Sequence, residues 1–306
     1  MITQINNFEI WLFIYIFLIG LCIGSFLNVV ILRSLSDESI IFPPSKCPKC
    51  LNKLKWYHNI PVVSYLFLRG KCAYCEKKIS IQYPIIEFLN AAAYDGLFLK
   101  YGLSLNLIFY FVFVSLLIVI FMTDIKEKVI FTSHTYILTI LGLLYNFLNK
   151  NLIDSIFGAI AGFLFLEILT YLLYKIIKKR AFGEGDSYVL MGLGSIFGFK
   201  SLFGIIILSF LIQVISVLPQ FIKGLLNKKE YSLILLLFIF AISTILSHFY
   251  INNIINIIVL FLSGILSSYK LLKMTKLNND IKQFPFAPSL ILGALIYYFT
   301  TFFFLG

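Results

Sequence analysis

Long apolar runs are the feature that most constrains how this chain can fold. An apolar stretch of roughly 18 to 25 residues is long enough to cross a bilayer as a helix. The candidate runs are residues 9–32, 83–99, 103–123, 130–148, 152–177, 186–199, 201–222, 231–249, 252–269 and 286–304. Because a backbone in lipid must satisfy its own hydrogen bonds, each spanning run is predicted to be helical. The sequence therefore predicts an all-α polytopic membrane protein with about ten transmembrane helices.

The overall composition agrees with this fold class. Hydrophobic residues make up 60% of the chain and charged residues only 13%. A soluble globular protein has about 25% charged residues. The composition therefore excludes soluble folds.

The distribution of basic residues predicts the orientation, because short cytoplasmic loops accumulate Lys and Arg. If the N-terminus lies outside, all but three of the 25 Lys and Arg residues fall in cytoplasmic loops. The three exceptions are Lys100, Lys150 and Lys200. The net charge of +11 then follows from topology and from contact with anionic lipid headgroups. We therefore expect membrane lipid, and no nucleic acid, among the partners.

The long polar segment 33–82 carries four cysteines in two C-x2-C pairs. Cys47 and Cys50 form the first pair, and Cys72 and Cys75 form the second. Two such pairs can supply four thiolates to one tetrahedral zinc ion. Disulfides and free thiols are the alternatives, and the expected cytoplasmic location disfavours disulfides. The pattern predicts a small zinc-ribbon-like insert with a closed, structural metal site.

Two carboxylates stand at the borders of apolar runs. Asp124 ends one run, and Asp186 follows Gly183 and Gly185 at the start of another. Ionisable groups are costly near the hydrocarbon region, so they are functional candidates there. With the N-terminus outside, both aspartates lie at the cytoplasmic border.

Two carboxylates that converge favour one kind of chemistry. They share a proton, so one can act as a general base on a water molecule and the other as a general acid toward a scissile carbonyl. Gly183 and Gly185 would let the backbone bend and let a substrate approach. The structural alternatives are that Asp186 is an ordinary helix cap and that Asp124 is a solvated loop residue.

A series of short motifs runs almost the full length of the chain. In order they are residues 24–33, the first cysteine pair, 56–61, 68–72, the second cysteine pair, 79–84, Glu87, Asp124, 183–186 and 284–288. Taken together, the series resembles the bifunctional prepilin peptidases, the type IV leader peptidase and N-methyltransferase family.

The resemblance implies an intramembrane-type aspartic protease with Asp124 and Asp186 as its catalytic pair. It implies that the four cysteines belong to a zinc-binding cytoplasmic loop in the bacterial inner membrane. The expected substrates are prepilins or pseudopilins, whose short basic leader is removed at the cytoplasmic face. Methylation of the new N-terminal amine by S-adenosylmethionine is implied by the resemblance alone, since no G-x-G-x-x-G loop is present.

The chain departs from the family pattern in three places. Residues 130–132 lack the proline expected after the first aspartate, Ala287 replaces a glycine, and residues 224–282 form an expected extra helical hairpin.

The resulting domains are a first transmembrane helix (1–32), the insert (33–82), a transmembrane catalytic core (83–222), the hairpin with its loops (223–285) and a C-terminal transmembrane helix (286–306).

Two other functions fit parts of the pattern. Glu167 lies in the middle of an apolar run and has no assigned role. Together, Glu167, Asp124 and Asp186 are compatible with a proton relay in a proton-coupled transporter. A non-catalytic zinc-ribbon scaffold for pilus assembly would need the cysteines but not the aspartates.

Overall fold

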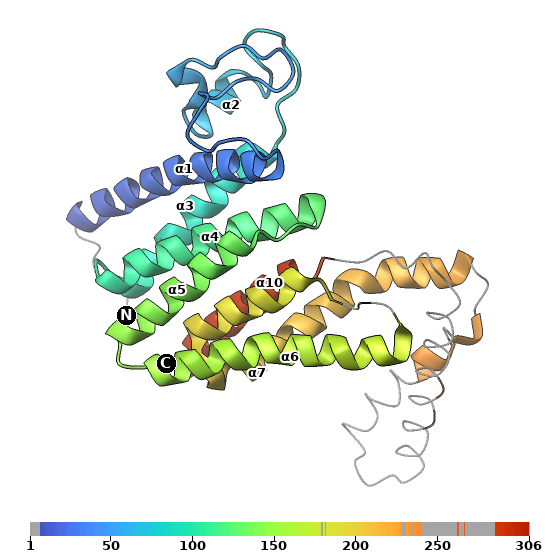
Figure 1. The fold of residues 1–306 in the computed structure, drawn as a ribbon. Coiled ribbons are helices and arrows are strands. Elements are labelled where there is room, and N and C mark those ends of the chain that lie inside the picture. The colour runs from blue at the N-terminus through green and yellow to red at the C-terminus, as the bar shows by residue number, and fades with distance from the viewer. Residues whose placement is uncertain are drawn as a thin grey trace. The chain divides into compact units, whose positions relative to one another are not determined.

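A computed structural model describes residues 7–178, 180, 182–227, 231–233, 235–239, 262, 266 and 285–305. Figure 1 shows that the regular elements in these residues are helices. Apart from two isolated antiparallel bridges, Lys46 with Lys53 and Lys71 with Lys78, the described residues contain no strand pairing. The predicted all-α class is therefore confirmed for this part of the chain.

The chain divides into two compact units, each described by itself. Unit 1 consists of Met1–Gly162 and Tyr188–Leu202, and unit 2 consists of Phe163–Ser187 and Phe203–Gly306. Two helices, α6 (Leu152–Ile177) and α7 (Glu184–Asn227), contribute residues to both units.

Unit 1 is built around a bundle of four long helices. They are α1 (Asn7–Leu35), α3 (Gln82–Tyr101), α4 (Leu105–Glu127) and α5 (Thr132–Leu148). Helix α1 packs along α3, both contact α4, and α4 contacts α5 (Figure 1). The buried core between α1, α3 and α4 consists of Leu27, Val30, Ile31, Ile86 and Val119.

The contact between α1 and α3 is close because small residues line it. A Cβ atom built on Gly20 would lie only 2.5 Å from the Cα atom of Ala91. At the same level, the buried Asn90 side chain donates a hydrogen bond to the carbonyl of Gly20 at 2.8 Å. Small residues that admit close approach and buried amides that bond across helices are typical of packing in membranes.

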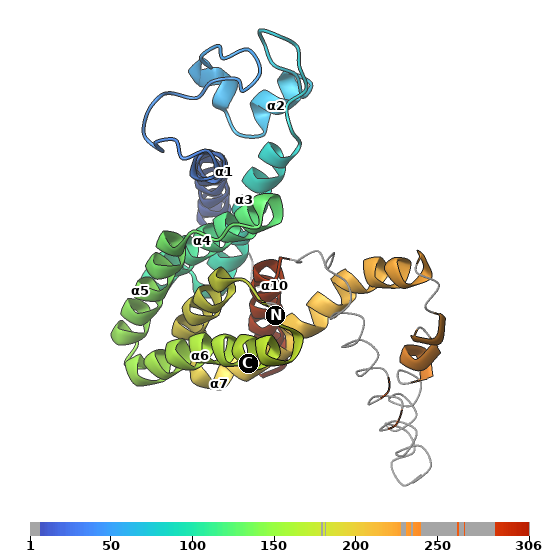
Figure 2. The same ribbon diagram turned by 45° about the vertical axis from the view of Figure 1, so that its right-hand side comes forward.

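The polar insert joins α1 to α3. It contains a 3-10 helix η1 (Trp56–Asn59), which contacts the short helix α2 (Val63–Phe67). The two isolated bridges each close one of the cysteine pairs. Both views place the insert next to the C-terminal end of α1 and the start of α3 (Figure 1 and Figure 2).

Helix α7 is interrupted at Gly198, whose φ of 79° and ψ of 172° are not helical. An interruption leaves preceding carbonyls without their partners in the helix. Buried side chains from α5 and α6 replace those partners. Asn146 donates to the carbonyls of Ser195 at 2.8 Å and Ile196 at 3.0 Å, and Ser155 donates to Ser195 at 2.5 Å. The sequence predicts a boundary between two apolar runs near residue 200. In the structure this boundary is a break within one helical element.

Unit 2 contains the later part of α6, both outer parts of α7 and helix α10 (Ala287–Leu305). The aromatic rings of Phe182, Phe210 and Phe286 pack together with centroid distances of 5.0 to 6.0 Å. Ser289 on α10 donates a hydrogen bond to Gln213 on α7 at 2.5 Å. Phe286 and its neighbours, part of the last sequence motif, therefore tie α10 to α7.

Among the described residues, four helices are long and apolar enough to cross a membrane. Their spans are Ile10–Leu35, Leu105–Glu127, Leu152–Ile176 and Glu184–Pro219, and a shorter apolar helix covers Ala287–Thr300. The runs 231–249 and 252–269, which make up the predicted extra hairpin, lie largely outside the described residues. The total of about ten spans therefore stays a prediction.

Candidate functional site

The structure brings the four cysteines of the insert into one cluster. The sulfur atoms of Cys47, Cys50, Cys72 and Cys75 all lie within 4.8 Å of one another. Cys47 and Cys72 are buried, and the other two are half-buried. All four are free thiols, so the cluster contains no disulfide.

Each cysteine pair lies on a turn with the same hydrogen bonds. The first cysteine donates its N–H to the carbonyl five positions later and accepts from the N–H four positions later. The bonds are Cys47 to Asn52 at 3.0 Å, Leu51 to Cys47 at 2.9 Å, Cys72 to Lys77 at 2.9 Å and Glu76 to Cys72 at 3.0 Å. The repeat shows that two matching knuckles present their thiols to a common point.

The spacing of the sulfur atoms fits a metal ion. Four sulfur atoms at about 2.3 Å from a tetrahedral zinc ion lie about 3.8 Å from one another. The sulfur atoms of Cys47 and Cys75 are 4.0 Å apart, far beyond the roughly 2.05 Å of a disulfide bond. The cluster can therefore hold a zinc-sized ion with little movement.

The thiols of the cluster differ in acidity. Backbone N–H groups of Tyr74 and Cys75 lower the pKa of Cys72 to about 7. For Cys50, a backbone hydrogen bond with Asn52 lowers the pKa, but desolvation and the neighbouring sulfur atoms outweigh it and raise the pKa to about 11. Successive thiolates repel one another, so a bound cation is needed for all four to ionise together near neutral pH.

Glu87, a member of the motif series, joins α3 to the insert. Its carboxylate accepts a hydrogen bond from the backbone N–H of Val62 at 2.7 Å. Val62 has a φ of 59° and immediately precedes α2. A second link comes from Asn28 on α1, which donates to the carbonyl of Tyr83 at 3.1 Å. Residues of the motifs 24–33 and 79–84 thus fix where the insert leaves the helices.

Asp124 lies in the last turn of α4. Its carbonyl accepts from the N–H of Lys128, the left-handed residue that ends the helix, at 2.9 Å. The residue is only 4% exposed. The alternative of a solvated loop residue therefore does not describe Asp124.

Asp186 lies in the first turn of α7. One carboxylate oxygen accepts from the N–H of Gly183 at 2.9 Å, and the N–H of Asp186 faces the carbonyl of Gly183 at 3.3 Å. This is the reciprocal part of a capping box, in which an acidic side chain in the first turn reaches back to the residue before the helix. Asp186 is 5% exposed, so it caps the helix from a buried position.

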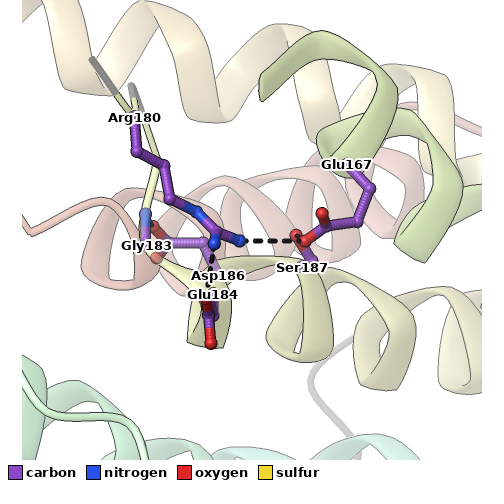
Figure 3. Close-up of polar contacts among 6 residues, drawn as sticks. All are labelled: Glu167, Arg180, Gly183, Glu184, Asp186 and Ser187. Carbon is purple, nitrogen blue, oxygen red and sulfur yellow. Dashed lines mark hydrogen bonds and ion pairs between the residues drawn. The ribbon is translucent and has the colours of Figure 1, made fainter. Parts of the chain in front are cut away.

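A polar network beside Asp186 connects the start of α7 to α6 within unit 2 (Figure 3). The buried Ser187 hydroxyl donates to the carboxylate of Glu167 at 2.8 Å. Arg180 pairs with the same carboxylate at 3.5 Å and also with Glu184. The arginine pairs are partly exposed, so they contribute about 1 kcal/mol or less. The hydrogen bond from Ser187 to Glu167 is buried only on the serine side.

Sequence reasoning did not identify Ser187 or Arg180 as part of the site. The available signal was an unexplained Glu167 in an apolar run and an arginine ending the basic stretch before Gly183. Asp124 belongs to unit 1 and Asp186 to unit 2, so the convergence of the two aspartates stays a prediction.

A separate cavity in unit 1 contains none of the predicted site residues. Its volume is about 840 Å³, and its walls include Phe147, Lys150, Asp154, Phe157 and Phe199.

Comparison with protein families matches most of the helical chain. The model of the bacterial peptidase A24 N-terminal domain matches residues 18–101, which include the four cysteines. The model of the type IV leader peptidase family matches residues 111–218, which include Asp124 and Asp186.

Curated relatives named prepilin leader peptidase/N-methyltransferase are similar to this chain. The Myxococcus xanthus protein is 35% identical to this chain over the matched residues. The match covers 63% of this chain and 58% of that relative's length. The Neisseria gonorrhoeae protein is 34% identical over 65% of this chain and 78% of its own length. The Bacillus subtilis protein is 32% identical over 70% of this chain and 86% of its own length. No solved structure matches the chain. The two family matches and these relatives show that the chain belongs to the type IV leader peptidase family.

Proposed function

We propose that this protein is a membrane aspartic endopeptidase that removes the basic leader of type IV prepilin-like or pseudopilin proteins. Asp124 and Asp186 are its catalytic dyad, and cleavage takes place at the cytoplasmic face of the inner membrane, with the N-terminus of the enzyme outside. Family membership supports the peptidase activity, and the names of the relatives support the substrate class.

The observation that carries the proposal is the burial of both aspartates. Each is at least nine-tenths buried in a terminal turn of a helix. An ionisable group near the hydrocarbon region is rare and is a functional candidate by default, so a buried carboxylate at the edge of an apolar helix is such a candidate. Both residues lie inside the segment that matches the family.

In the proposed reaction the two carboxyl groups share one proton. The ionised group takes a proton from a water molecule as the water oxygen attacks the scissile carbonyl carbon. The protonated group donates its proton to the carbonyl oxygen, which gives a neutral tetrahedral intermediate. As the intermediate collapses and the C–N bond breaks, the carboxyl group that took the proton from water gives it to the leaving amine. The other carboxylate takes back a hydroxyl proton from the intermediate, so the dyad is restored and no covalent enzyme intermediate forms.

The proposal gives the four-cysteine cluster a structural role. Cys47, Cys50, Cys72 and Cys75 would hold zinc, and an ion with four thiolate ligands has no open position for an activated water. The metal therefore holds the two knuckles together within the insert 33–82. We propose residues 83–222 as the catalytic core, followed by the predicted hairpin 223–285 and the helix 286–306.

Methylation is the second proposed activity, because the relatives are named N-methyltransferases. S-adenosylmethionine would supply the methyl group for the amine that cleavage exposes. The enzyme's own contribution would be to keep that amine at the cytoplasmic face after the leader departs.

A proton-coupled transporter is less well supported. That hypothesis uses Glu167, Asp124 and Asp186 as acids that relay protons, with Glu167 as an unexplained acid in an apolar run. The carboxylate of Glu167 instead accepts from Ser187 and pairs with Arg180, which accounts for its place beside α7.

The test is cleavage of a purified prepilin by the full chain in proteoliposomes. Asp124→Asn and Asp186→Asn should each lower the rate by at least about 100-fold, the size of a lost general acid or base. Mass spectrometry of the pilin N-terminus would report cleavage and any added methyl group together. Asp37→Asn, at an exposed position in the insert, is the matched control and should cleave at the normal rate. Full processing by either dyad variant would refute the proposed mechanism.

A further inference from the structure

The insert presents an uncovered apolar surface on η1 and α2. Val63, Leu66 and Phe67 are spaced to lie on one face of α2, and all three are exposed, Phe67 by 83%. Trp56, on the contacting element η1, is 79% exposed. We define these four residues as the η1–α2 surface. Exposed clusters of large apolar side chains mark sites of contact with a protein or a membrane.

The surface lies beside the apolar part of α1 rather than far out in the cytoplasm. A Cβ atom on Gly24 would lie 2.6 Å from the Cα atom of Glu87, so the two residues are in contact. Gly24 belongs to the candidate membrane span Ile10–Leu35. Since the carboxylate of Glu87 binds the N–H of Val62, the start of α2 is held level with this span. Figure 2 shows α2 next to the ends of α1 and α3.

The charges around the surface are those that attract anionic lipid. Lys55 directly precedes Trp56, and Arg69 follows α2 by two positions; both are exposed. Acidic residues of the insert are limited to Asp37, Glu38 and Glu76. A tryptophan flanked by basic residues is typical of segments that lie in the headgroup region of a bilayer. The same charges would repel the basic leader expected of a substrate.

We propose that the η1–α2 surface is an anchor that inserts into the cytoplasmic leaflet of the surrounding membrane. Its four apolar side chains lie among the headgroups and the upper acyl chains, and Lys55 and Arg69 contact the phosphates of anionic phospholipids. This contact holds the cysteine knuckles at the membrane surface. The proposal does not depend on the catalytic dyad.

The two tryptophans of the chain, Trp11 and Trp56, allow a direct test. In full-length Trp11→Phe protein, Trp56 is the sole tryptophan. The protein is placed in nanodiscs that contain phosphatidylglycerol, with or without bromine atoms on the upper acyl chains. The anchor predicts a blue-shifted Trp56 emission that brominated lipid quenches at least twofold and that aqueous acrylamide quenches weakly.

Two outcomes would overturn the anchor. Emission typical of water, with strong acrylamide quenching and no effect of bromine, would place the surface in the cytoplasm. Blue-shifted emission that neither quencher affects would mean that protein covers it. The Trp56→Phe variant reports Trp11 in α1 and should be quenched by brominated lipid, which validates the quencher.

The charge contribution is tested in the same Trp11→Phe protein. Brominated lipid should quench Trp56 more strongly when phosphatidylglycerol replaces phosphatidylcholine. Replacing Lys55 and Arg69 with Gln should at least halve this increase in quenching. The matched control replaces Lys77 and Lys78 with Gln; both are exposed on the second knuckle, and the gain should remain. An unchanged gain in the Lys55 and Arg69 variant would show that these side chains do not bind the phosphates.

Discussion

At the scale of single residues, hydrogen bonds of Asp186 and of its neighbour Ser187 define the first turn of α7. Asp186 uses one oxygen to cap α7 through Gly183. The adjacent Ser187 bonds to Glu167, which fixes the same turn against α6. Glu167 is therefore expected to be a positioning residue that acts through Ser187 on the direction of Asp186.

Glu167→Ala should lower kcat for leader cleavage about tenfold with little change in KM, since about 1.4 kcal/mol of transition-state stabilisation is lost. Glu167→Gln keeps an acceptor for Ser187 and should recover most of the rate with a similar pH profile. Glu184→Gln removes only the 74% exposed partner of Arg180 and should behave as wild type. Equal losses in the Glu167 and Glu184 variants would contradict the positioning role.

At the scale of elements, the contact between α1 and α3 and the pairing of the knuckles organise unit 1. Neither depends on long runs of specific residues. The helices approach because Gly20 faces Ala91, and the knuckles repeat one turn geometry at two places.

The helix contact makes a stability prediction. Gly20→Ala should lower the melting temperature in detergent, because the new methyl group overlaps Ala91 and overpacking costs about 1 to 3 kcal/mol. For Gly96 in α3, an added Cβ meets no atom within 4 Å from other parts of the described chain. Gly96→Ala should therefore leave stability unchanged or raise it by up to about 1 kcal/mol through helix propensity. Equal melting temperatures for the two variants would argue against the close packing.

The knuckles make a prediction about pH. Zinc binding must displace the protons of thiols such as Cys50, whose metal-free pKa is about 11, so protons compete with the metal. The affinity for zinc should rise by about tenfold or more between pH 6 and pH 8. It should fall as the pH decreases and Cys72, whose pKa is about 7, is protonated.

Competition with a coloured chelator would measure this affinity in the full chain. Cys72→Ala should abolish tight binding, and Cys22→Ala, in α1 outside the cluster, should not. Affinity that is independent of pH would exclude a thiolate site.

At the scale of the whole molecule, the distribution of basic residues sets the expected orientation. Lys126 near the end of α4 is expected in the cytoplasm, and Lys150 between α5 and α6 is expected outside. In a Cys22→Ala background, a membrane-impermeant maleimide should label Lys150→Cys in intact spheroplasts. Lys126→Cys should add labelling above that of the Cys22→Ala parent, which keeps the four cysteines of the insert, only after lysis, and the reverse pattern would invert the topology.

The sequence by itself determined the helical class and the composition of the four-cysteine cluster. An apolar run of about 20 residues that crosses lipid as one segment satisfies its own backbone as a helix, and two cysteines three positions apart are close enough along the chain to bind one ion. Only the tertiary structure decided that Glu87 holds Val62, that Glu167 holds Ser187, and that Asn146 and Ser155 bond the carbonyls released at Gly198. Spacing along a chain fixes distances only between near neighbours, whereas these partners are brought together by the packing of separate helices.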